Sequence, residues 1–246
     1  MDKIKIIQYI YKTSTINKTM STRKVLGKNA DRLKDKTVAI IGLGGLGCTT
    51  ANLLARLKIN LILADNDIVD DTNLERQILY DKKDLLKNKV DAAKEKLSQF
   101  AKIEAINKEL DEKNIDKIIP KKIDLVIDCT DNVKARLAIN RYCKKNNIDW
   151  IYSGAVCDIG AIFFVDNKNE GPCYECLQQE KEGATSCEIG VLNSLVVMVA
   201  AMTVNVAVQR LTDKKTDNKF IRINMNDNSI LKLSVKKNPK CKTCGG

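Results

Sequence analysis

The chain has 246 residues, enough for one large core, and its 44% hydrophobic and 30% charged residues are ordinary for a soluble globular protein. The formal net charge of +11 comes mainly from lysines spread along the chain, which indicates a generally basic surface rather than a clustered nucleic-acid site. The chain contains no histidine, which excludes Ser-His-Asp and Cys-His catalysis and removes the commonest zinc ligand.

Strand-like and helical patterns alternate after an opening segment, residues 1–36, that is polar, basic and expected to be helical in part. Predicted strands at 38–42, 61–65, 103–107, 125–128 and 150–153 alternate with predicted helices that end near residue 57 or cover 87–100 and 132–146. This alternation predicts an α/β fold with a Rossmann-like, doubly wound, mainly parallel sheet. Segments 162–165, 220–224 and 230–235 predict antiparallel strands that extend the same sheet, so residues 37–246 are expected to form one domain.

The first residues, the apolar stretch and the cysteines bear on where in the cell the protein is expected. We expect no secretory signal, because the first residues lack a small-residue cleavage site, and no membrane span, because the apolar stretch 195–208 is too short and suits a buried helix. Nine cysteines without an export signal predict a reducing, cytoplasmic location, where paired cysteines are first interpreted as metal ligands or catalytic groups.

The first strand runs into a glycine-rich turn within AIIGLGGLGCTTANLLARL, residues 39–57. The G-x-G-x-x-G spacing at Gly42, Gly44 and Gly47, between a strand and a helix, predicts nucleotide binding, since backbone N–H groups and the helix dipole attract phosphate. The missing side chains of Gly42, Gly44 and Gly45 let a phosphate approach the main chain. Asp65, at the end of the second strand, is placed to bind ribose hydroxyls. This motif alone fits NAD as well as ATP.

The next segment, DNDIVDDTNLERQILY at residues 65–80, favours ATP. It brings Asp67, Asn73, Arg76 and Gln77, and Lys89 follows shortly, so that cations lie near the phosphate turn and suit a triphosphate. Taken singly, Arg76 and Lys89 are equally well explained as solvated surface charges. Their conjunction indicates a phosphate site.

A further cluster lies at DLVIDCTDN, residues 124–132, where a predicted strand ends. Asp128, Asp131 and Asn132 follow that strand at the edge of the sheet where ligands bind. A carboxylate there can hold Mg²⁺ on the phosphates, although Asp131 alone could equally be a helix N-cap.

Together, GxGGxG, DxDxVxxxNLxRQ, a Lys-Val pair and CTDN resemble the ubiquitin-activating-enzyme-like superfamily, in its ThiF/MoeB/HesA branch, over roughly residues 30–246. The resemblance implies an adenylyltransferase that uses Mg-ATP to activate the C-terminal glycine of a small β-grasp ubiquitin-like or sulfur-carrier protein. Pyrophosphate is released, ahead of thiocarboxylate or thioester formation. By position it implies phosphate contact at Gly44, ribose binding at Asp65, phosphate stabilisation by Asn73, Arg76 and Lys89, and Mg²⁺ at Asp131. The expected nucleotide-binding residues are Gly42, Gly44, Gly45, Asp65, Asp67, Asn73, Arg76, Gln77, Lys89, Asp131 and Asn132, of which Arg76, Lys89 and Asp131 are also expected to be catalytic.

Two C-x-x-C pairs, Cys173/Cys176 and Cys241/Cys244, supply the four thiolates of a structural zinc knuckle. The resemblance implies the same zinc site. A redox pair and an iron–sulfur cluster are the alternatives, but neither pair follows a thioredoxin-like strand-to-helix turn.

The remaining cysteines divide into buried and reactive candidates. Cys48, Cys129 and Cys143 are expected to be small buried side chains. Cys187, in EKEGATSCEIGVLNS before the apolar helix, is the candidate catalytic thiol, and the resemblance implies a covalent link to the carrier or a sulfur relay. The terminal Gly245-Gly246 is expected to be a short tail.

The resemblance further implies a homodimer in which an N-terminal cation, Arg23 or else Lys18, reaches the ATP of the partner subunit. A separate protein is expected to donate sulfur. The alternatives are an enzyme that adenylates a small-molecule carboxylate or acts on tRNA, and a nucleotide-binding protein without activity. An NAD oxidoreductase is disfavoured, because the sequence shows neither a proton donor nor a substrate domain. The carrier and its pathway, in thiamine, molybdopterin, tRNA thiolation or protein modification, stay open.

Overall fold

The computed structural model describes residues 21–177, 189–214 and 219–245, which fall into two compact units divided between Asp31 and Arg32. In the described part of the first unit, helix α2 (Ser21–Leu26) ends at Gly27, whose φ of +56° suits glycine. Arg23 pairs with Asp31 at 2.6 Å. Helix α3 (Asn29–Leu33) crosses the division and leads into the second unit.

The second unit is built on an eight-stranded sheet with the order β3-β2-β1-β4-β5-β6-β7-β8. Strands β1 to β5 pair in parallel, and β5 to β8 pair in antiparallel fashion, as predicted. The strands are β1 (Thr37–Ile41), β2 (Asn60–Ala64), β3 (Ile103–Ile106), β4 (Leu125–Asp128), β5 (Trp150–Val156), β6 (Ile159–Val165), β7 (Lys219–Asn224) and β8 (Ser229–Ser234).

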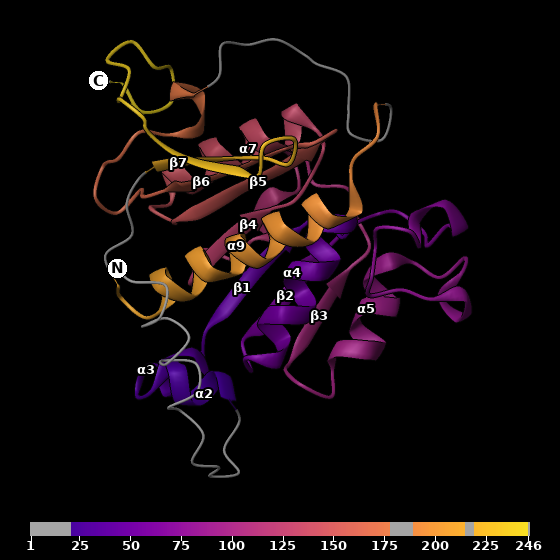
Figure 1. The fold of residues 1–246 in the computed structure, drawn as a ribbon. Helices are drawn as coiled ribbons and strands as arrows, with labels where there is room; N and C mark the ends of the chain where they lie inside the picture. Colours follow the sequence, from indigo (N-terminus) through magenta and orange to yellow (C-terminus); the bar gives the residue numbers. More distant parts are fainter. Residues whose placement is uncertain (1–20, 178–188, 215–218, 246) are drawn as a thin grey trace, which may run out of the picture. The chain divides into compact units, whose positions relative to one another are not determined.

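Helices cover both faces of the parallel part (Figure 1). On one face, α6 and α7 pack with inward side chains such as Ala39, Val126 and Trp150 in a single core cluster. On the other face lie α4 and α9, which run side by side. The helices of this unit are α4 (Gly45–Arg56), α5 (Lys89–Leu97), α6 (Ile115–Ile118), α7 (Val133–Lys145) and α9 (Asn193–Leu211).

The inner strands form because their apolar runs can be buried on two faces. In β1, β2 and β4 every residue but the first of β1 and of β2 is buried. This pattern is typical of parallel strands sandwiched between helices. Strand β8, by contrast, is an exposed edge, with Ile230, Leu231 and Leu233 between 44% and 47% exposed.

The predicted strands are confirmed, with two differences. Strands β5 and β6 are longer than predicted and meet in a tight hairpin, in which Cys157 adopts a φ of 50°. The sequence pattern missed the hairpin because Cys-Asp replaces the usual Asn-Gly turn signal. The short helix α6 also escaped prediction, since its four residues span barely one turn.

Helix α9 is long and apolar enough to cross a membrane by composition alone, but half of its apolar window is buried in the fold. Leu195, Val199, Ala200 and Thr203 are fully buried, where the helix packs against α4, β5 and β6. Near its end, Arg210 pairs with the buried carboxylate of Asp149 at 2.5 Å. The helix is therefore a core element on one side, as predicted.

Candidate functional site

The glycine turn lies between β1 and α4, and its glycines are required for different reasons. Gly42 has a φ of +86°, and a Cβ there would lie 2.9 Å from the carbonyl oxygen of Cys129. A Cβ on Gly47 would lie 1.8 Å from the Gly42 oxygen, and one on Gly45 would lie 2.8 Å from Val196 of α9. Within this group, only at Gly44 would a Cβ find open space. The packing therefore demands Gly42, Gly45 and Gly47, whereas Gly44 leaves the backbone accessible to a ligand.

The acid at the end of β2 holds this turn in place. The Asp65 carboxylate accepts hydrogen bonds from the backbone N–H groups of Leu43 at 2.5 Å and Asp67 at 2.8 Å. Burial raises the pKa of Asp65, while these hydrogen bonds and Lys89 oppose the rise. The Lys89 side chain is only 6% exposed, and its ammonium group pairs with Asp67 at 2.8 Å. A buried cation thus stands beside the turn that a phosphate would approach.

The next segment along the chain is folded by a side-chain cap. Asp70 accepts a hydrogen bond from the Thr72 N–H at 2.9 Å and starts a short 3₁₀ helix at 71–73. The Asn73 carbonyl then accepts from the N–H groups of Arg76 and Gln77, which turns both side chains to the pocket. Gln77 is 3% exposed, and its Oε1 has no hydrogen-bond partner among the described residues. Such an orphaned acceptor suits a site completed by a ligand.

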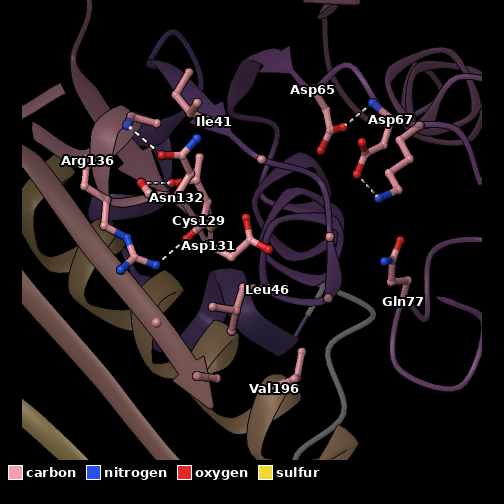
Figure 2. Close-up of a pocket in the computed structure, with 18 of the residues that line it drawn as sticks. Ile41, Leu46, Asp65, Asp67, Gln77, Cys129, Asp131, Asn132, Arg136 and Val196 are labelled. Atoms are coloured by element: carbon pink, nitrogen blue, oxygen red, sulfur yellow. Dashed lines mark hydrogen bonds and ion pairs between the residues drawn. The ribbon is translucent and has the colours of Figure 1, made fainter. Parts of the chain in front are cut away.

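The residues after β4 form a second tight turn. The Asp128 carboxylate accepts from the backbone N–H of Thr130 at 2.9 Å and from its hydroxyl at 2.7 Å. Burial raises the pKa of Asp128 to about 6, although the charge of Arg136 opposes this. Asn132, rather than Asp131, is the N-cap of α7, because its Oδ1 accepts from the N–H of Lys134 at 2.8 Å. The Asp131 carboxylate is directed into the pocket in Figure 2.

All of these elements meet around one pocket of about 830 Å³ at the carboxyl ends of β1, β2, β4 and β5. Every residue predicted to bind nucleotide lines this pocket, from Gly42 to Asn132. The far wall, formed by Arg136, Tyr152, Gly154 and Ala161, was not predicted from the sequence. Arg136 comes four residues after the N-cap Asn132, so helical spacing would have placed it on the pocket side. The strand residues carry no such signal.

The predicted buried thiols are confirmed. Cys48 and Cys143 are fully buried and Cys129 is 9% exposed. Burial raises the pKa of the Cys48 thiol and raises that of Cys129 to about 12, so both stay protonated and unreactive at neutral pH. The candidate catalytic thiol, Cys187, lies outside the described residues.

The two C-x-x-C pairs converge although 68 residues separate Cys173 from Cys241. The sulfurs of Cys173 and Cys241 are 3.5 Å apart, those of Cys176 and Cys244 are 3.4 Å apart, and all four lie within 4.8 Å of one another. A tetrahedral zinc ion with Zn–S bonds of about 2.3 Å needs sulfurs about 3.8 Å apart. The cluster therefore fits the predicted four-cysteine knuckle.

A partly buried acid fixes this cluster to the rest of the fold. Glu175, between the first two cysteines, accepts a hydrogen bond from Asn140 of α7 at 2.9 Å and another from Thr243 of the second pair. Asn140 in turn accepts from the backbone N–H of Tyr174 at 3.0 Å. Helix α7 therefore joins the cysteine cluster at one end to the Asp131 turn at the other.

Comparison with known proteins identifies the family. The sequence profile of the ThiF family matches residues 16–243. The chain belongs to the ThiF family. It is 31% identical to molybdopterin-synthase adenylyltransferase of Escherichia coli K12 over 223 residues, covering 87% of this chain and 89% of that protein. It is also 31% identical to the ThiS adenylyltransferase of the same organism over 222 residues, covering 87% and 88%.

A solved structure with the same fold supports this family assignment. The E. coli MccB structure with ATP superposes with a TM-score of 0.77 at 25% identity, covering 89% of this chain and 69% of that one. The resemblance inferred from the glycine turn and the CTDN segment is confirmed by this ThiF family membership, and so are the Rossmann-like sheet and the adenylyltransferase class.

The N-terminal cation predicted to act across a dimer stays a prediction. Arg23 belongs to the first unit, where it pairs with Asp31, and Lys18 lies outside the described residues.

The open space at Gly44 generates a prediction. Gly44→Ala should lower the free energy of unfolding by no more than about 1 kcal/mol, because nothing crowds its Cβ and the expected loss comes from alanine being a poorer N-cap than glycine for α4. It should still weaken ATP binding, since the new methyl group occupies the pocket. Gly47→Ala, the matched control, should lower the free energy of unfolding by more than about 3 kcal/mol through its backbone clash.

Urea unfolding and calorimetric ATP titration measure the two effects. Equal stabilities of the two variants, or unchanged ATP affinity in Gly44→Ala, would contradict the division of roles within the glycine turn.

Proposed function

We propose that this ThiF family protein adenylates the C-terminal glycine of a small ubiquitin-like or sulfur-carrier protein at the expense of ATP. The proposal rests on one observation: Arg76, Lys89 and Asp131 line the same pocket as the glycine turn, whose backbone is accessible at Gly44. The adenylyltransferases among its relatives support the reaction class, and their names specify a molybdopterin synthase or the carrier ThiS as what they act on.

In the proposed reaction, a carboxylate oxygen of the carrier attacks the α-phosphorus of ATP. A C–O–P bond forms, the bond between the α- and β-phosphates breaks, and pyrophosphate leaves with the electron pair. No general base is required, because the attacking carboxylate is already ionised, which agrees with a chain that has no histidine. Catalysis then rests on positioning and on neutralising phosphate charge.

The pocket residues divide into three roles. Lys89 and Arg76 supply positive charge near the phosphates, together with the first N–H groups of α4. Asp65 offers carboxylate oxygens to the ribose, and Asp131 would hold Mg²⁺, which supplies further charge neutralisation when bound.

The far wall of the pocket suits the tail of the carrier. Tyr152, Gly154, Ile159 and Ala161 lie on the face of β5 and β6 that lines the pocket. Gly154 and Ala161 are paired across the two strands and carry no long side chain into the pocket, so we place an extended glycine-containing segment of the carrier along this wall, beside the phosphates. The same proposal includes later thiocarboxylate formation with a separate sulfur donor and a role for Cys187. It also includes a homodimer that uses Arg23 and a cytoplasmic location.

The four clustered cysteines are proposed to bind a structural Zn²⁺ with no open coordination position. The purified protein should contain about one zinc per chain, and Cys173→Ser should lose that zinc and unfold at a lower temperature. Cys157→Ser, which changes an exposed thiol outside the cluster, should keep it. Metal analysis with thermal unfolding measures both. Iron in place of zinc, or full zinc in Cys173→Ser, would contradict the assignment.

The reaction itself is tested by exchange of labelled pyrophosphate into ATP, with candidate carriers ending in Gly-Gly and total tRNA added separately. Carrier-dependent exchange is expected, reduced about 100-fold or more in Arg76→Ala and Asp131→Ala. Arg56→Ala and Asp116→Ala, exposed residues of the same types outside the pocket, should exchange normally. Exchange only with tRNA would establish the alternative substrate, and ATP binding without any exchange would contradict the proposed reaction.

A further inference from the structure

Arg136 lines the pocket, yet none of the roles above uses it. Its side chain is only 13% exposed and is contacted on three sides. One terminal nitrogen donates to the carbonyl oxygen of Thr130 at 2.7 Å, and Nε lies 3.7 Å from the Asp128 carboxylate. The guanidinium carbon stands 5.0 Å from the ring centre of Tyr152. These contacts fix the side chain in one place.

The Thr130 contact matters because Thr130 immediately precedes Asp131 in the chain. Asp128 holds the Thr130 N–H and hydroxyl, and Arg136 holds the Thr130 carbonyl. Hydrogen bonds therefore hold Thr130 at its N–H, its hydroxyl and its carbonyl group. The next peptide bond leads directly to Asp131, so these contacts fix the backbone from which the Asp131 side chain extends into the pocket (Figure 2).

Packed aromatic rings connect Arg136 to the cysteine cluster. The Tyr152 ring under the guanidinium packs against Tyr174, with ring centres 5.0 Å apart. Tyr174 lies within the first C-x-x-C pair and also contacts Trp150 at 5.9 Å. The guanidinium is thus held by rigid, packed elements rather than by a surface loop.

We propose that Arg136 is a positioning residue, which fixes the Thr130–Asp131 turn so that Asp131 can hold the Mg²⁺ of Mg-ATP. The inference rests on the proposed function. Lysine cannot replace Arg136, because a single ammonium group cannot donate to a carbonyl, face a carboxylate and lie flat on a ring at once. Groups that orient a metal ligand in this way typically change metal affinity by about 10- to 100-fold when they are lost.

The test compares ATP affinity with Mg²⁺ and in excess EDTA, by calorimetry on the purified full chain. In Arg136→Lys, the gain in affinity that Mg²⁺ gives should shrink by about 10-fold or more, whereas the metal-free affinity should change by less than about 3-fold. Arg56→Lys is the matched control, because Arg56 also stacks on a ring, that of Phe100 at 4.3 Å, but outside the pocket. It should bind like wild type.

A double-mutant comparison tests whether Arg136 acts through Asp131. If it does, Arg136→Lys added to Asp131→Asn should cause no further loss of the Mg²⁺-dependent gain. Tyr152→Leu, which removes the ring beneath the guanidinium, should reduce the same gain in a chain that still carries Arg136. Fluorescence of Trp150, the single tryptophan, reports folding of every variant.

The outcomes separate the two proposals. An unchanged Mg²⁺-dependent gain in Arg136→Lys, additive losses in the double variant, or an equal loss of metal-free affinity would overturn the positioning role while leaving the proposed function intact. Wild-type protein that binds ATP no better with Mg²⁺ would overturn the assignment of Mg²⁺ to Asp131 within the proposed function, and the positioning role with it.

Discussion

The site depends on one close crossing of backbones, where the turn after β1 passes the end of β4. Ile41 accepts a hydrogen bond from the Cys129 N–H at 2.8 Å, and Gly42 donates to Ala64 of β2 at 2.9 Å. At that spacing there is no room for a side chain on Gly42 or Gly47. The crossing is therefore possible only with glycine, and it sets the start of α4 beside the carboxyl ends of three strands. It thereby brings together cations and carboxylates that lie on separate loops of the chain.

Three carboxylates at this edge hold backbone turns in place. Asp65 holds the glycine turn, Asp70 caps the 3₁₀ helix, and Asp128 closes the turn after β4, each by accepting backbone N–H groups. Side chains that face the pocket come from the neighbouring residues, such as Arg76 and Asp131. This arrangement explains the density of acids in a basic chain. Each acid gives a loop one conformation, and the loop then presents a residue to the pocket.

Most of the pocket wall formed by the glycine turn and by the segments after β2 and β4 could be predicted from sequence, because its residues follow apolar strands whose carboxyl ends meet at one edge. The cysteine pairs were predictable from their spacing. The far wall was not, since Tyr152 and Gly154 lie within a strand whose apolar pattern describes burial and not contacts. The role of Glu175 also needs the fold, because it joins α7 to two segments far apart in the chain. Asn132 rather than Asp131 caps α7, a choice between adjacent residues that sequence alone leaves open.

We propose that the glycine turn and its neighbours form a site for a triphosphate rather than a dinucleotide. Competitive calorimetric binding of Mg-ATP and NAD⁺ to the same purified chain tests this most directly. Mg-ATP is expected to bind at least about 10-fold more tightly than NAD⁺, since charge-assisted contacts to the extra phosphate each contribute about 1.5–3 kcal/mol. NAD⁺ that binds as tightly as Mg-ATP, or displaces it at equal concentration, would show that the site is not built for a triphosphate.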